Sequence, residues 1–156
     1  MMKNFPDFPE ANDSNEQLTV HYGEEDVPVE EQILENILQE VGREQEAEFA
    51  SVELVYVNET EIVAINKEHL SRDYVTDIIS FRYDEQDHLN AIEGTLYCCA
   101  PRITEQSREL STPSSQEFYR IFIHGLLHLI GYNDQSKEEK ATMTRLENHY
   151  LKLFDL

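Results

Sequence analysis

The sequence predicts an α+β domain in which a mixed β-sheet of about four strands carries about five helices, one of them buried. Short β-branched and apolar segments alternate with longer segments that repeat apolar residues every three or four positions. The strand-like segments 77–83 and 91–100 are separated only by the polar segment 84–90, which predicts a hairpin loop. A chain of 156 residues, 40% of them hydrophobic, is long enough for one domain with an ordinary core.

The first part of the chain is expected to form a tail, a strand and a helix. Residues 1–16 mix Asn, Asp, Glu and Pro and predict a loosely ordered acidic tail, which leaves 17–156 as a single domain. Alternating β-branched residues predict a strand at 17–22. Apolar residues at helical spacing then predict a helix at 28–41 that Gly42 ends.

The next segment predicts a buried strand followed by a capped helix. Residues 52–57 are too apolar for a half-exposed strand, so we expect this strand in the centre of the sheet. Asn58, with Glu61 three positions later, has the spacing of a capping box. The helix that it opens is expected to reach Leu70.

Three helices are predicted after the hairpin. They are expected at 102–110, at 113–130 and at 136–153, the last of them capped by Ser136 together with Glu139. The apolar residues of the final helix predict one buried stripe, made of Met143, Leu146, Tyr150 and Leu153.

Two histidines lie in the most apolar stretch of the chain. Nearly every residue of 121–130 is a large hydrophobe, which predicts a helix buried in the core. His124 and His128 are four positions apart, so both project from one helix face. Gly131 predicts the end of the helix, after which the chain can turn and bring Asp134 back toward the two histidines. Three ligands with an open fourth position are typical of a catalytic zinc site.

Two other interpretations of this stretch remain open from the residues alone. Both histidines could be core residues whose ring nitrogens have protein partners, although an unpaired buried polar group costs about 1–3 kcal/mol. The spacing H-x-x-x-H-x-x-G-x-x-D also resembles that of the metzincin zinc peptidases. Gly125 stands where those enzymes carry their glutamate base, and this disfavours a peptidase.

The charge of the chain is unusual for a protein that handles nucleic acid. The formal net charge is −20 at pH 7. A local phosphate-binding patch is nevertheless possible, because several arginines fall in the later part of the chain; scattered, solvated arginines are the alternative. These arginines are Arg72, Arg82, Arg102, Arg108 and Arg120.

The cysteines and the absence of long apolar runs bear on location. Cys98 and Cys99 are neighbours in a predicted strand, so they should point to opposite faces and remain reduced thiols. We find neither an apolar run long enough to span a bilayer nor a signal-peptide pattern, and we therefore expect a cytoplasmic protein without a membrane partner.

Two motifs resemble those of the YbeY family of bacterial rRNA-maturation endoribonucleases. The segment His124-Gly-Leu-Leu-His-Leu-Ile-Gly-Tyr132 is similar, without a gap, to the family signature H-G-x-L-H-L-x-G-Y-D-H. Upstream, Thr76-Asp77-Ile-Ile-Ser80-Phe81 looks like the family's Thr-Asp or Thr-Asn pair before a strand that ends in Ser-Phe, and Ile65-Asn66 resembles its Leu-Asn. The resemblance covers about residues 50–150.

The resemblance implies a metal-dependent, single-strand-specific endoribonuclease that acts in 16S rRNA 3′-end maturation and ribosome quality control. It places one Zn²⁺ per chain on His124 and His128, with Asp134 at the third-ligand position. The implied partners are single-stranded RNA and the small ribosomal subunit, and the oligomeric state stays open. Arg72 is a candidate for holding phosphate, and Asp77 for orienting a metal-binding histidine or capping a turn.

The chain departs from the family pattern in three places. Leu70 replaces an arginine, Thr95 replaces an aspartate, and Asn133-Asp134 replaces the Asp-His that ends the signature. The fold and metal site should tolerate these changes. Two functions of other classes remain open: a metal hydrolase whose substrate is not RNA, and a non-catalytic ribosome-assembly factor with a structural metal.

Overall fold

A computed structural model describes residues 17–83 and 91–156. The predicted tail at 1–16 and the predicted hairpin loop at 84–90 lie outside these residues. Within the described ranges no helix is both long enough and apolar enough to cross a bilayer. In chain order the elements are β2 (Leu18–His21), α1 (Glu31–Gln45), β3 (Glu48–Val57), α2 (Glu59–Leu70), β4 (Ile78–Arg82), β5 (Ala91–Cys99), α3 (Ala100–Leu110), α4 (Ser114–Ile130) and α5 (Lys137–Leu153).

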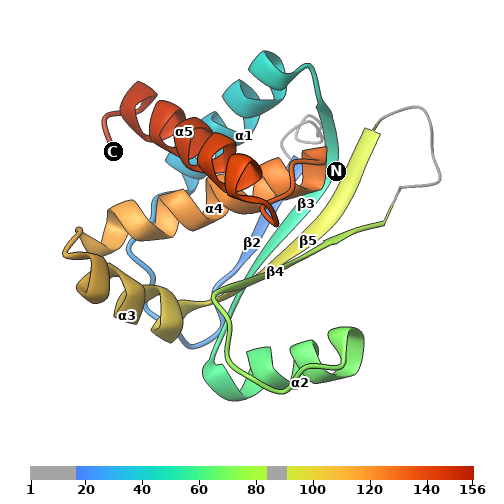
Figure 1. Ribbon diagram of the computed structural model, residues 1–156, viewed down its shortest axis with the longest axis vertical. Helices are drawn as coiled ribbons and strands as arrows, with labels where there is room; N and C mark the ends of the chain where they lie inside the picture. The colour runs from blue at the N-terminus through green and yellow to red at the C-terminus, as the bar shows by residue number, and fades with distance from the viewer. Residues whose placement is uncertain (1–16, 84–90) are drawn as a thin grey trace, which may run out of the picture.

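The four strands form one mixed sheet in the order β2-β3-β5-β4 (Figure 1). β2 pairs with β3 and β3 pairs with β5 in parallel, whereas β4 pairs with β5 antiparallel. The predicted α+β class, with four strands and five helices, is therefore confirmed for the described part of the chain. The apolar segment 52–57 lies in β3, at the centre of the sheet as predicted.

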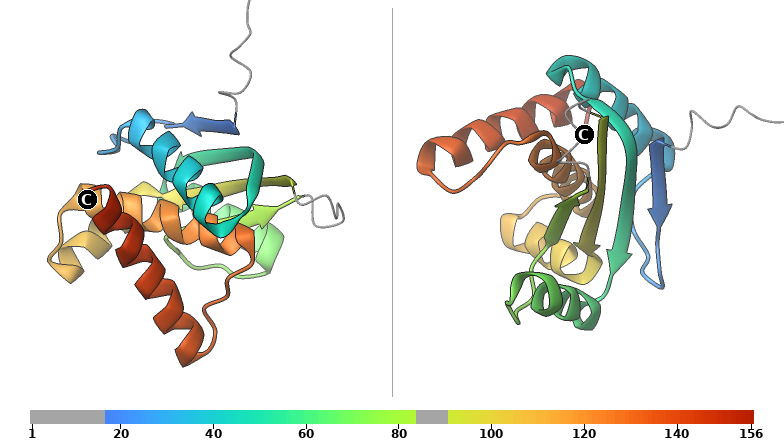
Figure 2. Two further views of the ribbon diagram at one scale, coloured as in Figure 1. Left: turned by 90° about the horizontal axis from the view of Figure 1, so that it is seen from above. Right: turned by 90° about the vertical axis from the view of Figure 1, so that its right-hand side faces the viewer.

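The helices divide unequally between the two faces of the sheet. Buried residues of α1, α3, α4 and α5 form one large core with the strands, whereas α2 covers the other face over a smaller cluster (Figure 1). Figure 2 shows that α4 lies between the sheet and α5. α4 is thus covered on both sides, which is why its sequence is apolar almost all round.

Two glycines allow α4 to lie directly on the sheet. A Cβ atom on Gly125 of α4 would lie 2.7 Å from Cδ1 of Ile78 and 2.9 Å from Cδ1 of Leu96. On the sheet side, a Cβ atom on Gly94 of β5 would lie 2.8 Å from Cδ2 of Leu129 and 2.6 Å from the Phe81 carbonyl oxygen. Side chains on either residue would push the helix away from the strands.

The adjacent cysteines point to opposite faces of the sheet, as predicted. Both are free and buried. Cys98 belongs to the large core under α4, and Cys99 belongs to the small cluster under α2. Burial raises the pKa of the Cys98 thiol well above its ordinary value, which keeps this thiol protonated.

Two helix predictions are wrong in detail. α1 continues through Gly42 to Gln45, and its C-cap residue Glu46 adopts the left-handed conformation with φ 54°. Gly42 is needed for packing, because a Cβ atom there would lie 2.9 Å from the Ala47 carbonyl oxygen. In α5, Leu153 is 49% exposed, whereas Glu147 occupies a buried place in the predicted apolar stripe.

We expect Gly94→Ala to destabilise the protein by about 1–3 kcal/mol, because the added methyl group must displace a strand carbonyl and α4 together. Denaturant unfolding followed by circular dichroism measures this difference. Ser51→Ala, at an exposed position of β3, is the matched control and should change stability by less than about 0.5 kcal/mol. Equal stability of the two variants would show that α4 can move off the sheet at little cost.

Candidate metal centre

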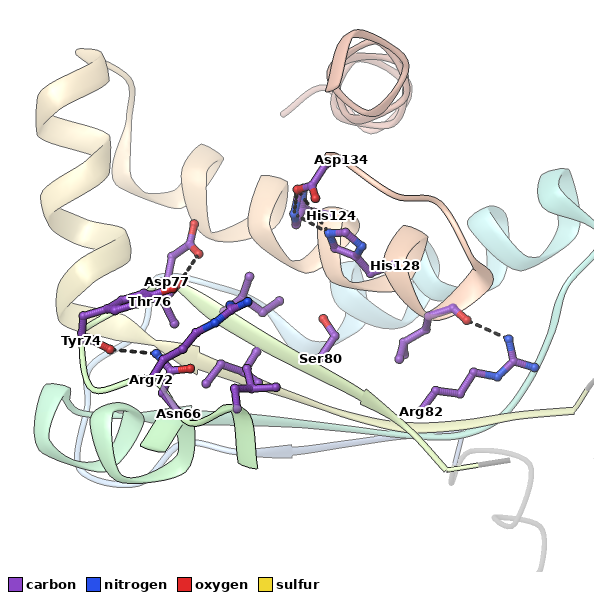
Figure 3. A pocket seen from close by; sticks show the side chains of 14 residues that line it. Asn66, Arg72, Tyr74, Thr76, Asp77, Ser80, Arg82, His124, His128 and Asp134 are labelled. Atoms are coloured by element: carbon purple, nitrogen blue, oxygen red, sulfur yellow. Dashed lines mark hydrogen bonds and ion pairs between the residues drawn. The ribbon is translucent and has the colours of Figure 1, made fainter. Parts of the chain in front are cut away.

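Three potential ligands from α4 and the loop after it meet at one point (Figure 3). The Nε2 atoms of His124 and His128 are 3.0 Å apart. Oδ2 of Asp134 lies 3.5 Å from Nε2 of His124 and 3.4 Å from Nε2 of His128. The α-helical period aligns the histidines, and Gly131, with φ 127°, ends the helix so that the chain turns back.

Hydrogen bonds at the far side of each ring fix how the two imidazoles face each other. Nδ1 of His124 lies 2.6 Å from Oε2 of Glu147, and Nδ1 of His128 lies 2.9 Å from the Tyr132 carbonyl oxygen. Both partners are acceptors, so each neutral ring carries its proton on Nδ1. Two Nε2 lone pairs and a carboxylate oxygen then point at the same place, where they could hold a cation.

The spacing of the three atoms fits a tetrahedral metal ion. With metal–ligand bonds of about 2.1 Å, a tetrahedron has edges of about 3.4 Å. The three observed separations lie between 3.0 and 3.5 Å. Two imidazole nitrogens and one carboxylate oxygen are ligands that zinc accepts, and three ligands leave the fourth tetrahedral position free. The group predicted from the sequence could therefore hold one metal ion.

Glu147 of α5 orients His124, a role for which the sequence suggested Asp77. The Glu147 side chain is buried, and its Oε1 accepts a hydrogen bond of 3.0 Å from Nη1 of Arg120. Burial alone would lower the pKa of His124, but the hydrogen bond and charge of Glu147, together with Asp134 and Asp77, raise it above its ordinary value. The sequence signal for Glu147 was a carboxylate in an apolar stripe, four residues after Met143.

Asp77 lies beside this centre without bonding to its histidines. It lines the same pocket, and its Oδ1 is 3.5 Å from the Thr76 hydroxyl. Its backbone carbonyl accepts a hydrogen bond of 2.8 Å from the Cys99 amide, which anchors the start of β4 to the end of β5. Thr95, at a departure from the family pattern, pairs with Phe81 on the α2 face of the sheet, away from the pocket.

The candidate ligands form one wall of an open pocket of about 440 Å³. The opposite wall is the loop between α2 and β4, from which Arg72 extends toward the histidines (Figure 3). Ser80 and Arg82 of β4 complete the lining, and Arg82 donates a 2.9 Å hydrogen bond to the Leu129 carbonyl oxygen. The predicted site residue Arg72 and the candidate metal ligands thus face the same space.

The five arginines considered from the sequence do not gather into one patch. Arg72 and Arg82 line the pocket, whereas Arg120 lies behind His124 with Glu147. Arg102 is engaged along α3, where it bonds to Glu105 at 2.7 Å and to Glu109 at 3.1 Å. Arg108 is exposed in the last turn of the same helix. The pocket therefore contains only two of these five arginines.

Comparison with known proteins assigns this arrangement to a family. The sequence model described as Endoribonuclease YbeY matches residues 13–155. The chain belongs to the YbeY family. This match confirms the resemblance that the two motifs indicated.

Relatives and a solved structure agree with the assignment. The chain is 42% identical over 118 residues to Endoribonuclease YbeY of Chloroherpeton thalassium, covering 76% of this chain and 79% of that protein. It is 33% identical over 123 residues to the Chlorobaculum tepidum protein of the same name, covering 79% and 88%. The solution structure of TM1509 from Thermotoga maritima matches with a TM-score of 0.58 and 25% identity, over 88% of this chain and 91% of that one.

Replacing Glu147 should weaken metal binding at this YbeY-family centre. We expect Glu147→Gln to lower the affinity for a divalent ion about 10- to 100-fold, because the neutral amide no longer increases the basicity of His124. Competition with a chromophoric chelator measures the affinity. Glu138→Gln, an exposed change on the same helix, is the control and should leave it unaltered. If both variants bound metal equally, α4 alone would orient His124.

Proposed function

We propose that the protein is a zinc-dependent, single-strand-specific endoribonuclease. The observation that carries the proposal is the arrangement of one pocket: a group that could hold a metal lies on one wall, and Arg72 extends from the other. Membership of the YbeY family favours RNA as the substrate. The proposed context is 16S rRNA 3′-end maturation and ribosome quality control, with the small ribosomal subunit as partner.

Cleavage of a phosphodiester needs charge neutralisation and an oriented nucleophile. When bound, zinc would polarise phosphoryl oxygens and lower the pKa of a coordinated water to about 7. The protein's own residues hold the geometry: His124 and His128 present unprotonated Nε2 atoms, and Asp134 supplies the third ligand. Arg72 is proposed to bind a phosphate oxygen from the opposite wall, as guanidinium groups commonly do.

Asp77 is proposed as a further active-site residue on the pocket wall. Its carboxylate adds negative charge beside His124 and contributes to the raised pKa of that imidazole. It also lines the pocket between the Arg72 loop and α4, where it can interact with substrate or solvent. The three candidate ligands and these two wall residues together make up the proposed site.

A zinc peptidase is the less favoured alternative because of where position 125 lies. The peptidase base would replace Gly125, but even a Cβ atom there would lie 2.7 Å from Ile78 and 2.9 Å from Leu96. A glutamate would not fit without moving the sheet. The chain therefore lacks the group that prepares water for peptide hydrolysis at this position.

The proposed cytoplasmic location rests on the cysteines and the family. Cys98 and Cys99 are both free, in keeping with a reducing compartment.

A net charge of −20 opposes binding to RNA at long range. We infer that free RNA binds weakly and that the small subunit brings the substrate strand to the pocket.

The decisive test combines metal analysis with RNA cleavage. We expect about one zinc per chain and cleavage of single-stranded RNA that a chelator abolishes, with duplex RNA left intact. His128→Ala should lose metal and cleavage together, whereas Asp134→His should keep the metal because both side chains bind zinc. Metal content should also fall in acid, because protons compete for the imidazole of His124, whose pKa is raised.

The alternatives give different results in the same assays. Zinc in the wild-type protein without RNA cleavage would favour an assembly factor with a structural metal. Cleavage of peptides or esters in place of RNA would favour another metal hydrolase. Zinc at wild-type stoichiometry in His128→Ala would place the metal outside the proposed centre.

A further inference from the structure

The rim of the metal pocket carries an unusual concentration of exposed apolar side chains. Among residues 17–83 and 91–156, six large hydrophobic side chains are exposed, and three of them belong to residues 70–75, several of which line the pocket. They are Leu70 at 40%, Tyr74 at 53% and Val75 at 37% exposure. Leu70 and Tyr74 also line the pocket itself. Exposed apolar groups clustered at a binding pocket indicate a ligand contact.

Hydrogen bonds to α2 hold the backbone of this rim, residues 70–75, in place. Asn66 of α2 is buried, and its side-chain Nδ2 donates a 2.9 Å hydrogen bond to the Tyr74 carbonyl oxygen (Figure 3). The Asn66 backbone carbonyl accepts a 3.2 Å hydrogen bond from the Arg72 amide. Ser71, in the left-handed conformation with φ 56°, forms the turn between them. The ring of Tyr74 is therefore presented by a fixed backbone that does not depend on its side chain.

The two kinds of group on this loop match the two parts of a nucleotide. Arg72 extends toward the candidate metal ligands, where a phosphate would be neutralised. Tyr74 contributes an exposed aromatic residue to the lining of the same pocket, and Leu70 contributes an exposed aliphatic one. The pocket volume of about 440 Å³ falls within the roughly 300–1,000 Å³ of small-molecule sites, so it has room for more than a phosphate group.

We propose that Tyr74, supported by Leu70, stacks an unpaired base of the nucleotide next to the scissile phosphate. This inference rests on the proposed RNA-cleaving function and adds the means by which the pocket selects single strands. Bases in a duplex are already stacked and paired, so only an unpaired base can be placed on the ring. Stacking also supplies affinity that a chain of charge −20 cannot obtain from many cationic contacts.

Tyr83 is a suitable control for the stacking residue. It is 59% exposed, slightly more than Tyr74, but it follows β4 on the α2 face of the sheet and donates a 3.1 Å hydrogen bond to Thr95. Tyr74→Ala and Tyr83→Ala therefore each remove one exposed tyrosine side chain from the protein. Only the first change removes a ring from the metal pocket.

The test uses zinc-loaded full-length protein and a short single-stranded 2′-O-methyl RNA as the probe. The probe contains the fluorescent base 2-aminopurine, whose fluorescence falls when it stacks on a ring. Both the affinity of the protein for the probe and the fluorescence change are measured. A gel checks that the probe stays intact. We expect Tyr74→Ala to bind about 5- to 150-fold more weakly and to lose the fluorescence change, since this is the usual effect of removing one base-stacking ring. Tyr74→Phe should retain both, and Tyr83→Ala should behave as wild type.

The salt dependence separates stacking from phosphate binding. Tyr74→Ala should leave the slope of log affinity against log salt unchanged, because no phosphate contact is lost. Arg72→Ala should reduce that slope by about 0.7, the value for one contact to a single strand, and keep the fluorescence change. In cleavage assays Tyr74→Ala should raise KM for single-stranded RNA while kcat stays near its wild-type value.

The outcomes distinguish this inference from the proposed function. If wild-type protein cleaves RNA and Tyr74→Ala matches Tyr83→Ala in affinity and fluorescence, the stacking role is wrong and the nuclease stands. If the probe stacks on the wild-type protein but not on Tyr74→Ala, and no RNA is cleaved, the stacking role is supported and the proposed nuclease activity is wrong. Unchanged binding to free RNA combined with weaker action on ribosomal subunits would make the rim a protein contact and overturn the stacking role.

Discussion

The close approach of α4 to the sheet is the constraint on which the rest of the site depends. Glycines on both sides, Gly125 in the helix and Gly94 in β5, bring the two surfaces into direct contact. With the helix fixed in position and rotation, His124 and His128 face the open pocket beside β4. The signature glycine after the first histidine therefore serves packing, and the chemistry has to be supplied by other groups.

Electrostatics explains how two partly buried imidazoles and a carboxylate remain together. Glu147 and the Tyr132 carbonyl accept the Nδ1 protons, so that the opposite nitrogens are free to bind a cation. Arg120 in turn balances the charge of Glu147, which is almost fully buried. The candidate ligands are thus oriented by hydrogen-bond partners, and the charge of one of these partners, Glu147, is compensated by the guanidinium group of Arg120. These contacts join α4 to α5.

Sequence reasoning reached those features that depend on local spacing. The histidines four residues apart, the glycine that ends α4 and the capping boxes at Asn58 and Ser136 follow from helix geometry alone, and the structure contains each of them. The strand pattern likewise placed 52–57 in the centre of the sheet. These elements could be predicted because their determinants are close together in the chain.

Features that depend on packing between distant segments were not predictable in the same way. Glu147 contacts His124 across 23 residues, and only the crossing of α5 over α4 brings them together. The arginines spread over different surfaces for the same reason, since Arg102 finds its partners within α3 and Arg120 finds Glu147. Gly42 seemed to end α1, but the approach of Ala47 and Phe49 made it an interior packing residue.

The way in which Asn66 holds the pocket rim has an evolutionary consequence. Its hydrogen bonds go to main-chain groups of Arg72 and Tyr74, which every substitution other than proline preserves. The rim can therefore accumulate side-chain changes while its path in space stays constant. Preference for one substrate over another can drift at these positions independently of the residues that perform the reaction, so that descendants of one ancestor could diverge in target while sharing a single chemical apparatus.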